Sequence, residues 1–246
     1  MPLLTAGRQL SCGRGHSFDI ARSGYINLLQ PQERRSRQPG DTPAAVAARR
    51  RLHDAGFTQP LLEEILRFSG ARREDIVLDA GCGDGFYLGS AVQAVEFEGY
   101  GVDISTRAID AAARRYPRCQ WIVANADRFL PFGDGSFSLL WSITARMNSA
   151  EFRRVLRSDG RLLVAIPAPD DLIELRGAGR DRNGSTIERF AGEFSVIARE
   201  RVTTAADLDA AAVQDVLVSI YRPLRSRPVS AMRLTFSLDL LLFRPK

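Results

Sequence analysis

The chain has 246 residues, 45% of them hydrophobic, which is enough for one core of about 150–200 residues and a small appendage. It holds no apolar run near the roughly 18 residues of a membrane span, no leader-like start and only three widely spaced cysteines, so we expect a reduced cytoplasmic protein without membrane contact. The net charge of +5 lies in the first 54 residues, where nine Arg face four acids, and this favours a polyanionic partner such as nucleic acid.

The first 42 residues are rich in Gly, Arg, Gln and Pro and contain only short apolar pieces. They predict a small irregular module that ends in a linker. Asp41-Thr42-Pro43 is a typical helix start, because a cap residue is followed by a proline at an early helical position. We therefore divide the chain into a module at 1–42 and a main domain at 43–246, whose first two helices are expected over 44–55 and 59–70.

The main domain then alternates between apolar strands and helices. Strands separated by helices of about 10–15 residues predict an α/β fold with a parallel sheet covered on both faces. Near the end we expect a strand over 193–202, a helix over 204–221 and a last strand over 233–245, which could return antiparallel at the sheet edge. The alternating part predicts strands at 75–81, 99–105, 119–126, 137–143 and 161–169, and helices at 86–95, 106–117 and 148–160.

A glycine-rich turn lies between the first strand and its helix, in the run VLDAGCGDGFY. Its three glycines allow a tight turn whose backbone approaches a ligand, with the amides of the next helix facing it. About 20 residues later Asp103 ends the next strand, where a carboxylate can accept the ribose hydroxyls of an adenosine group. A nicotinamide or flavin dinucleotide fold shares these features. Asp79, however, stands before the first glycine, and an acid there suits a cationic ligand with an amino group better than a pyrophosphate.

This arrangement resembles the S-adenosylmethionine-dependent methyltransferases. VLDAGCGDG resembles their first motif, GVDIS their second, and NADRFLPFGDGSFSLL the stretch that follows their third strand. The resemblance implies a Rossmann-like, seven-stranded α/β fold with S-adenosylmethionine as the cofactor. It also implies roles for individual residues: Asp79 near the methionine amino group; Gly81, Gly83, Asp84 and Gly85 along the methionine portion; Asp103 on the ribose; Ile104 on the adenine; and Asn125 with Ala126, or Asp127 instead, at the adenine edge.

A more specific resemblance starts in the N-terminal module. The run HSFDIARSGYINLLQPQERRSRQPGD, followed by DAGFTQPL, is similar to the bacterial 23S ribosomal RNA guanine N-1 methyltransferases, the family that includes enzymes of tylosin-type macrolide resistance. The similarity covers nearly the whole chain and implies methyl transfer to guanine N-1 of ribosomal RNA. Two other functions stay open, namely a divergent enzyme that methylates a small molecule and a non-catalytic relative that binds cofactor or RNA.

In that family the N-terminal module is a zinc finger, with a CxxC pair upstream of a Cys-x3-His pair. Cys12 and His16 match the second pair, but no Cys or His precedes Cys12. Two ligands bind zinc too weakly to fold a module, so we expect no zinc, unless two chains of a homodimer each donate a pair. His53, on the first helix, is expected at the surface. The module should instead dock on the main domain through its apolar side chains: Phe18, Ile20, Tyr25, Ile26, Leu28 and Leu29.

The substrate half of the resemblance is less complete. Arg146 stands where the family has Pro, Asp171 where it has His, and Thr58 where a Tyr is common near the cofactor. Asp171 is a candidate acceptor for the guanine N-1 proton, although Asp170 and Asp171 could equally be helix-capping residues. Basic side chains near the linker are expected to contact RNA, with a solvated charge run as the alternative for the first three of them: Arg34, Arg35, Arg37, Arg49 and Arg50.

Overall fold

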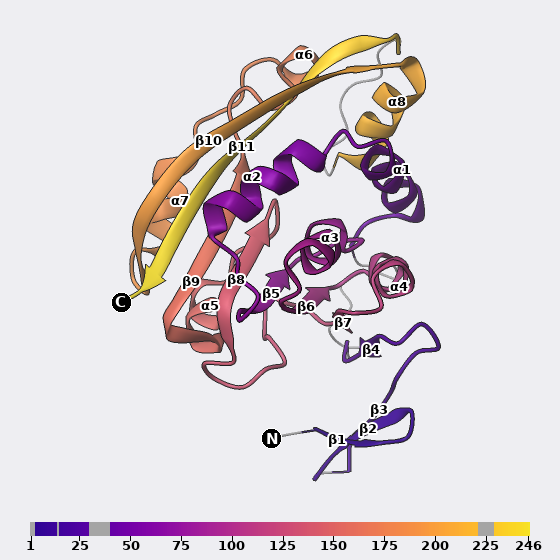
Figure 1. Cartoon of the computed structure of the whole chain (residues 1–246), viewed down its shortest axis with the longest axis vertical. Coiled ribbons are helices and arrows are strands. Elements are labelled where there is room, and N and C mark those ends of the chain that lie inside the picture. The colour runs from indigo at the N-terminus through magenta and orange to yellow at the C-terminus, as the bar shows by residue number, and fades with distance from the viewer. Residues whose placement is uncertain (1–2, 14, 30–39, 221–228) are drawn as a thin grey trace.

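A computed structural model of the chain describes residues 3–13, 15–29, 40–220 and 229–246. Its main body is a single large β-sheet with helices packed against both faces (Figure 1). The strands of this sheet are β4 (Ile26–Asn27), β5 (Ile76–Ala80), β6 (Glu98–Asp103), β7 (Gln120–Val123), β8 (Phe137–Ile143), β9 (Leu156–Pro167), β10 (Phe194–Leu208) and β11 (Met232–Pro245).

The strand order is β10-β11-β9-β8-β5-β6-β7-β4. Strands β4 to β9 run parallel to one another, whereas β11 is antiparallel to both β9 and β10. The predicted Rossmann-like α/β fold is therefore confirmed, with eight strands in the sheet instead of seven. The carboxyl ends of β5 to β9 all lie along one edge of the sheet, which we call the carboxyl edge, and their starts lie along the opposite, amino edge.

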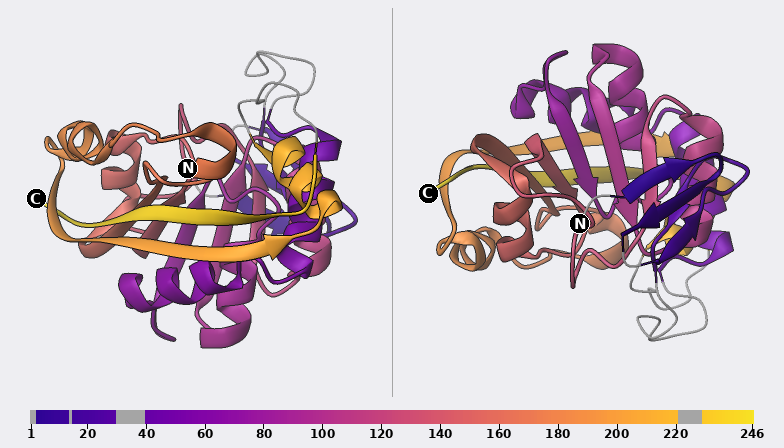
Figure 2. Two further views of the ribbon diagram at one scale, coloured as in Figure 1. Left: turned by 90° about the horizontal axis from the view of Figure 1, so that it is seen from above. Right: turned by 90° about the horizontal axis from the view of Figure 1, so that it is seen from below.

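Two apolar cores fill the spaces on either side of the sheet. The larger core holds side chains of the helices on one face, and the smaller core is closed by two helices on the other face (Figure 2). None of the helices in the described part of the chain is long and apolar enough to cross a membrane. The first face carries α1 (Pro43–Asp54), α2 (Gln59–Ser69), α3 (Phe86–Val95), α4 (Thr106–Arg115) and α8 (Ala210–Ser219), and the second carries α5 (Ser149–Val155) and α7 (Asn183–Phe190).

The predicted helix starts and stops near the linker are confirmed. Oγ1 of Thr42 accepts a hydrogen bond from the backbone N of Ala45 at 3.1 Å, and Pro43 occupies the first helical position of α1. Helix α2 ends at Gly70, which adopts a left-handed φ of +60°. These local signals place α1 and α2 directly before β5, next to the glycine-rich turn.

Two predicted boundaries and one predicted strand position are wrong. The helix expected over 148–160 stops at Val155, because Leu156 already pairs with Phe137 at the start of β9. The helix expected from 204 begins only at Ala210, because β10 pairs with β11 without a register shift from Ala198 to Leu208. That ladder outweighs the helix propensity of the alanines in this stretch. As a result β11 lies inside the sheet and β10 forms its edge.

The N-terminal module is more regular than its composition predicts. Strands β1 (Leu3–Ala6), β2 (Gln9–Cys12) and β3 (Ser17–Asp19) form a separate antiparallel sheet, and strands this short leave no periodic pattern in a sequence (Figure 1). The module then contributes β4 to the main sheet, where Ile26 pairs with Ile122 of β7.

Docking through the second half of the module is confirmed. Leu29 is buried in the larger core, Tyr25 packs against that core, and Ile26 and Leu28 pack against the smaller one. The two other apolar residues expected to dock have different partners. Phe18 pairs with Leu10 inside the small sheet, and Ile20 forms an isolated bridge with Ile26. The short segment from Tyr25 to Leu29 is therefore the part that fastens the module to the main domain.

Candidate active site

The glycine-rich turn lies at the carboxyl edge of the sheet, between β5 and α3. Gly81 and Gly85 adopt left-handed φ values of +89° and +78°. A Cβ on Gly81 would lie 2.5 Å from Cβ of Ala145, and one on Gly85 would lie 2.5 Å from Cη2 of Trp121. Only glycine meets both the backbone and the space requirement here. The turn is held against β6 because the backbone N of Gly81 donates to the carbonyl of Val102 at 2.7 Å.

Asp79, near the end of β5, is buried with only 2% of its surface exposed. Within the described part of the chain, its Oδ1 has no hydrogen-bond partner. Burial, with a smaller contribution from the charge of Asp103, raises the pKa of Asp79 to about 8. A buried polar atom without a partner is costly and rare in proteins. Such an atom beside a glycine turn points to a ligand that supplies the missing donor.

Asp103 is positioned by two backbone amides. Its Oδ2 accepts from the N of Gly83 at 3.0 Å, and its Oδ1 accepts from the N of Ser105 at 2.8 Å. Burial raises the pKa of this carboxyl, and the two amide hydrogen bonds act in the opposite direction. Each carboxylate oxygen keeps a further lone pair for a ligand hydroxyl. Ile104, the next residue, is half-buried and packs against the larger core.

The structure corrects the expectation for His53 and changes that for Thr58. His53 is buried, and its ring stacks on Phe86 at a centroid distance of 4.0 Å and an angle of 3°. Its Nδ1 lies 2.6 Å from Oγ1 of Thr58, and its Nε2 faces Oδ1 of Asp84 at 3.6 Å. Burial lowers the pKa of His53 to about 3, so the ring is neutral. Thr58 therefore reaches the glycine-rich turn through His53.

The signal for this burial was present in the sequence. Ala45, Arg49 and His53 are spaced by four residues, so they share one face of α1. That face is the inner one, because Ala45, Ala48 and Leu52 are buried with His53.

The adenine-edge candidates lie in the loop that follows β7. The backbone N of Ala124 donates to the carbonyl of Asp103 at 3.1 Å, so this loop starts beside the ribose candidate. Oδ1 of Asn125 accepts from the N of Asp127 at 3.1 Å, while Asp127 itself is exposed and 3.4 Å from Nε of Arg146. The half-buried Asn125 and Ala126 are thus better placed at the site than Asp127.

The loops after β8 and β9 form the other side of the site. Thr144, in the loop after β8, has a left-handed φ of +50°, which is strained for a β-branched residue. Oδ1 of Asp171 accepts from the N of Ser237 at 3.1 Å, and its Oδ2 lies 3.6 Å from Nη1 of Arg176. Helix α6 (Ile173–Arg176) has no side-chain cap, so the capping role considered for Asp170 and Asp171 is wrong.

Burial raises the pKa of Asp171, which makes it a stronger base than an exposed carboxylate. Tyr87, which was not predicted as a site residue, lies in the first turn of α3 and is close enough to Asp171 and Asp84 for their charges to act on it. Burial raises its pKa most, and the charges of Asp84, Asp171 and Asp79 raise it further. The phenol therefore keeps its proton. Its position in the first turn of α3, directly after the glycines, is the sequence signal that could have identified it.

The expected RNA-contacting arginines divide into three groups. Arg34, Arg35 and Arg37 lie outside the described residues. Arg50 is exposed on α1, with its Nε 3.8 Å from Asp54. Arg49 points the other way, towards the glycine-rich turn, and its Nη1 donates to Oδ2 of Asp41 at 2.5 Å.

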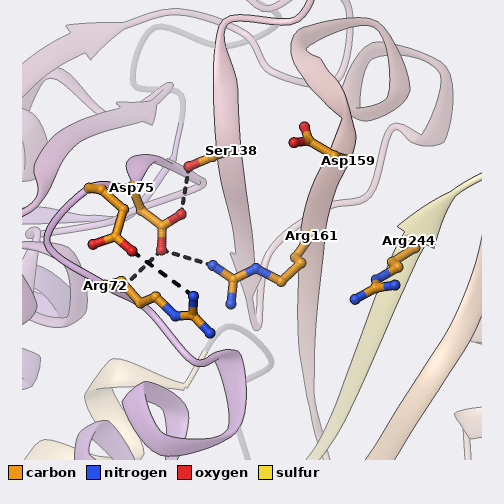
Figure 3. A pocket seen from close by; sticks show the side chains of 7 residues that line it. Arg72, Asp75, Ser138, Asp159, Arg161 and Arg244 are labelled. Carbon is orange, nitrogen blue, oxygen red and sulfur yellow. Dashed lines mark hydrogen bonds and ion pairs between the residues drawn. The ribbon is translucent and has the colours of Figure 1, made fainter.

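A hollow of about 370 Å³ lies at the amino edge of the same sheet (Figure 3). Its buried carboxylate is engaged: Asp75 accepts from Oγ of Ser138 at 2.7 Å and from Nη2 of Arg161 at 2.8 Å. A hollow whose buried carboxylate is already satisfied resembles a structural joint more than a ligand site. Its lining residues are Arg72, Glu74, Asp75, Ser138, Asp159, Arg161 and Arg244.

Comparisons with known proteins give the family of the chain. The family profile described as "Methyltransferase domain" matches residues 77–164, and that described as "RlmA, N-terminal" matches residues 1–37. The 23S rRNA (guanine(748)-N(1))-methyltransferase of Streptomyces fradiae is 38% identical over 219 residues, which are 85% of this chain and 77% of that protein. The chain belongs to the 23S rRNA (guanine-N(1))-methyltransferase family. YxjB of Bacillus subtilis (strain 168), provisionally named as a member, is 31% identical over 229 residues, which are 86% of this chain and 79% of that protein.

As a member of this family the chain is an S-adenosylmethionine-dependent methyltransferase. A solved TehB-like S-adenosylmethionine-dependent methyltransferase from Corynebacterium glutamicum has the same fold. The two structures superpose with a TM-score of 0.53 at 20% identity, and the match covers 83% of this chain and 100% of that chain. The residues present fit the cofactor, since Asp79 lacks a donor that an ammonium group provides and Gly81 leaves no room for a side chain.

The predicted half zinc site can be placed only in part. Cys12 ends β2 with its side chain outside the described part of the chain, and His16 is exposed just before β3. Across 3–13, 15–29, 40–220 and 229–246, no three His, Cys, Asp or Glu side chains gather as a metal site. The matching N-terminal profile is that of a zinc ribbon. The expected absence of zinc stays a prediction.

Proposed function

We propose that the chain transfers a methyl group from S-adenosylmethionine to N-1 of a guanine in 23S ribosomal RNA. The observation that carries this proposal is the extent of the similarity. It includes the N-terminal module at residues 1–37, which a generic methyltransferase does not need, and 85% of the chain matches a relative named for this reaction. The buried, unsatisfied Asp79 beside the glycine-rich turn supports the cofactor half of the proposal.

In this proposal the cofactor lies along the carboxyl edge, and the residues below bind its methionine portion, its ribose and its adenine in turn. Asp79 accepts from the ammonium group, and the turn formed by Gly81, Gly83, Asp84 and Gly85 follows the methionine portion. Asp103 accepts from the ribose hydroxyls, Ile104 packs on the adenine, and Asn125 and Ala126 face its edge. When bound, the cofactor supplies a methyl group already activated by a sulfonium, so the protein mainly contributes alignment with the acceptor.

On the acceptor side, the guanine must leave its base pair, because N-1 lies on the pairing edge. We propose that a carboxylate oxygen of Asp171 accepts the N-1 proton as N-1 takes the methyl group, since its raised pKa suits a proton acceptor. Tyr87 stays protonated and can donate a hydrogen bond to the base. Arg34, Arg35, Arg37 and Arg50 would bind RNA phosphates.

The experiment uses the full chain, tritiated S-adenosylmethionine and transcribed 23S ribosomal RNA hairpins. A methyl group on N-1 blocks base pairing, so reverse transcription should stop at the modified guanine. Asp171→Asn should lower the methylation rate by roughly 10²- to 10⁴-fold, the contribution expected of a proton-transfer group, and leave cofactor affinity unchanged. Methyl transfer to a small molecule, with none to RNA, would favour the alternative enzyme class.

We further propose that residues 1–42 fold as a metal-free module beside the catalytic domain at 43–246. Two of the usual four zinc ligands bind the metal too weakly to fold the module. Its attachment through Tyr25 to Leu29 and through β4 supports a packing role that does not need zinc. Metal analysis of the purified chain should find well below one zinc per chain, and a chelator should not change the melting temperature. Stoichiometric zinc, for example shared between two chains, would contradict this.

A further inference from the structure

Arg49 lies where the proposed amino-acid end of the cofactor would be. It belongs to the inner face of α1, and a Cβ placed on Gly83 would be 3.5 Å from its Nη1. Its Nη1 donates to Oδ2 of Asp41 at 2.5 Å, and its Nη2 donates to the carbonyl of Ser219 at 3.1 Å. A guanidinium carries five N–H donors, so these two bonds position the group and leave others for a ligand.

Charge also singles out this arginine. Burial works against the charged form of Arg49, but the carboxylates of Asp41, Asp84 and Asp103 outweigh it and raise its pKa. Burial raises the pKa of Asp84, and the charges of Arg49 and Arg115 both oppose that rise, so Arg115 is also near the turn. It is, however, ion-paired with Asp54 and lies over the ring of Tyr116. Among the described residues, Arg49 is thus the cation that sits against the glycine-rich turn.

The amino-acid end of the cofactor carries one ammonium and one carboxylate. The turn offers a matching pair, with the unsatisfied carboxyl group of Asp79 at one end and the guanidinium of Arg49 beside Gly83. An arginine fork forms two parallel hydrogen bonds to a carboxylate. We propose that Arg49 binds the α-carboxylate of S-adenosylmethionine and so selects ligands with a complete amino-acid end. This inference rests on the cofactor placement proposed above.

The sequence predicts RNA contacts for both Arg49 and Arg50. In the structure, the side chains of Arg49 and Arg50 differ in exposure and in partners. That of Arg49 is 27% exposed and held between Asp41 and Ser219, whereas that of Arg50 is 48% exposed on the outer side of α1. A phosphate backbone can reach Arg50, but Arg49 faces a turn already lined by carboxylates. The carboxylate of a small ligand whose ammonium meets Asp79 fits this position better than an RNA phosphate.

The test compares two ligands that share an adenosine and differ in the amino-acid end. Calorimetry on the full chain would measure S-adenosylhomocysteine and 5′-methylthioadenosine, which lacks that end. Arg49→Ala should weaken S-adenosylhomocysteine roughly 10- to 100-fold, the range of a charge-assisted hydrogen bond, and leave methylthioadenosine within about twofold. Arg51→Ala is the matched control, because Arg51 also lies on α1 but its ion pair is to Asp215 of α8, away from the turn. It should change neither affinity.

A third ligand separates the carboxylate from the ammonium. Decarboxylated S-adenosylhomocysteine should bind the wild-type chain more weakly than S-adenosylhomocysteine. Both ligands should bind Arg49→Ala with equal affinity, because the substitution and the decarboxylation remove the same contact between Arg49 and the ligand carboxylate. Equal weakening of all three ligands by Arg49→Ala would make the role structural and overturn the inference. A preserved preference for the carboxylate, or loss of RNA hairpin binding alone, would also overturn it. If the wild-type chain binds none of the three, the cofactor placement itself fails.

Discussion

Strand β5 has a buried aspartate at each end, and the two differ in their partners. Asp75, at the amino edge, accepts hydrogen bonds from the backbone N of Arg72, from Ser138 and from Arg161, each within 2.7–2.8 Å (Figure 3). Asp79, at the carboxyl edge four residues later, has an Oδ1 that no described group satisfies. Their exposures are similar, at 7% and 2%, so burial alone does not separate them.

What separates them is the completeness of the surroundings. Arg161 also donates to the carbonyls of Ser69 and Gly70 at 2.7 and 2.8 Å. The guanidinium of this one β9 residue therefore links the end of α2 to the start of β5. A satisfied network of this kind stabilises a fold, whereas an unsatisfied buried carboxyl costs stability that a ligand can recover. The amino edge therefore stabilises the domain, and the carboxyl edge carries a buried carboxyl group that still lacks a partner. Three substitutions probe this comparison.

The largest effect is expected at the satisfied end. Arg161→Ala leaves the carboxylate of Asp75 buried without its cation and removes the donor to two carbonyls, so the free energy of unfolding should fall by about 3–5 kcal/mol. Urea unfolding measures this change. Arg244→Ala, an exposed residue beside the same hollow, should change it by less than about 0.5 kcal/mol. Cofactor affinity below the unfolding transition should be unaffected by Arg161→Ala; a loss there would mean that the two edges are coupled.

A smaller effect is expected at Asp103, and it should appear in binding. Asp103→Ala removes an anionic acceptor for the ribose hydroxyls, so the affinity for S-adenosylhomocysteine should fall by about 1.5–3 kcal/mol. Calorimetry measures this, and Asp103→Asn, which keeps one acceptor oxygen, should lose less. An unchanged affinity in Asp103→Ala would remove Asp103 from the ribose site.

The third prediction is a pH dependence of stability at Asp79. Its folded pKa of about 8 lies above its ordinary value, so the folded state holds a proton that the unfolded state releases from about pH 4 upward. This group's contribution therefore makes stability fall as the pH rises from about 4 to about 8. Asp79→Asn should flatten that slope in thermal melts.

Ligand binding gives the same group a second readout. An ammonium placed beside Asp79 favours its charged form, so binding of S-adenosylhomocysteine near pH 7 should release up to about one proton. Binding enthalpies measured in buffers of different ionisation enthalpy count that proton. The buffer dependence should disappear in Asp79→Asn. If the wild-type enthalpy does not depend on the buffer, Asp79 does not meet the ammonium.

Much of the fold could be predicted because its signals are local. The helix over 86–95 and the strand over 137–143 occur at the predicted residues, since each follows a turn and has its own apolar pattern. The glycine-rich turn with Asp79 and Asp103 was also predicted, because the left-handed backbone at Gly81 and Gly85 restricts those positions to glycine. The end of β10 and the entry of β4 into the sheet could not be predicted, since both depend on pairing with distant strands.

The sequence by itself determined the order of the elements, the glycine-rich turn and the acids that flank it, because backbone sterics and residue chemistry act over a few positions. The tertiary structure decided the use of the remaining charged and polar groups. Packing of α1 against α4 and α8 turned Arg49 and His53 into the site and left Arg50 outside. The same physics distinguished Asp75 from Asp79, because whether a buried carboxylate is satisfied depends on partners up to 86 residues away in the chain.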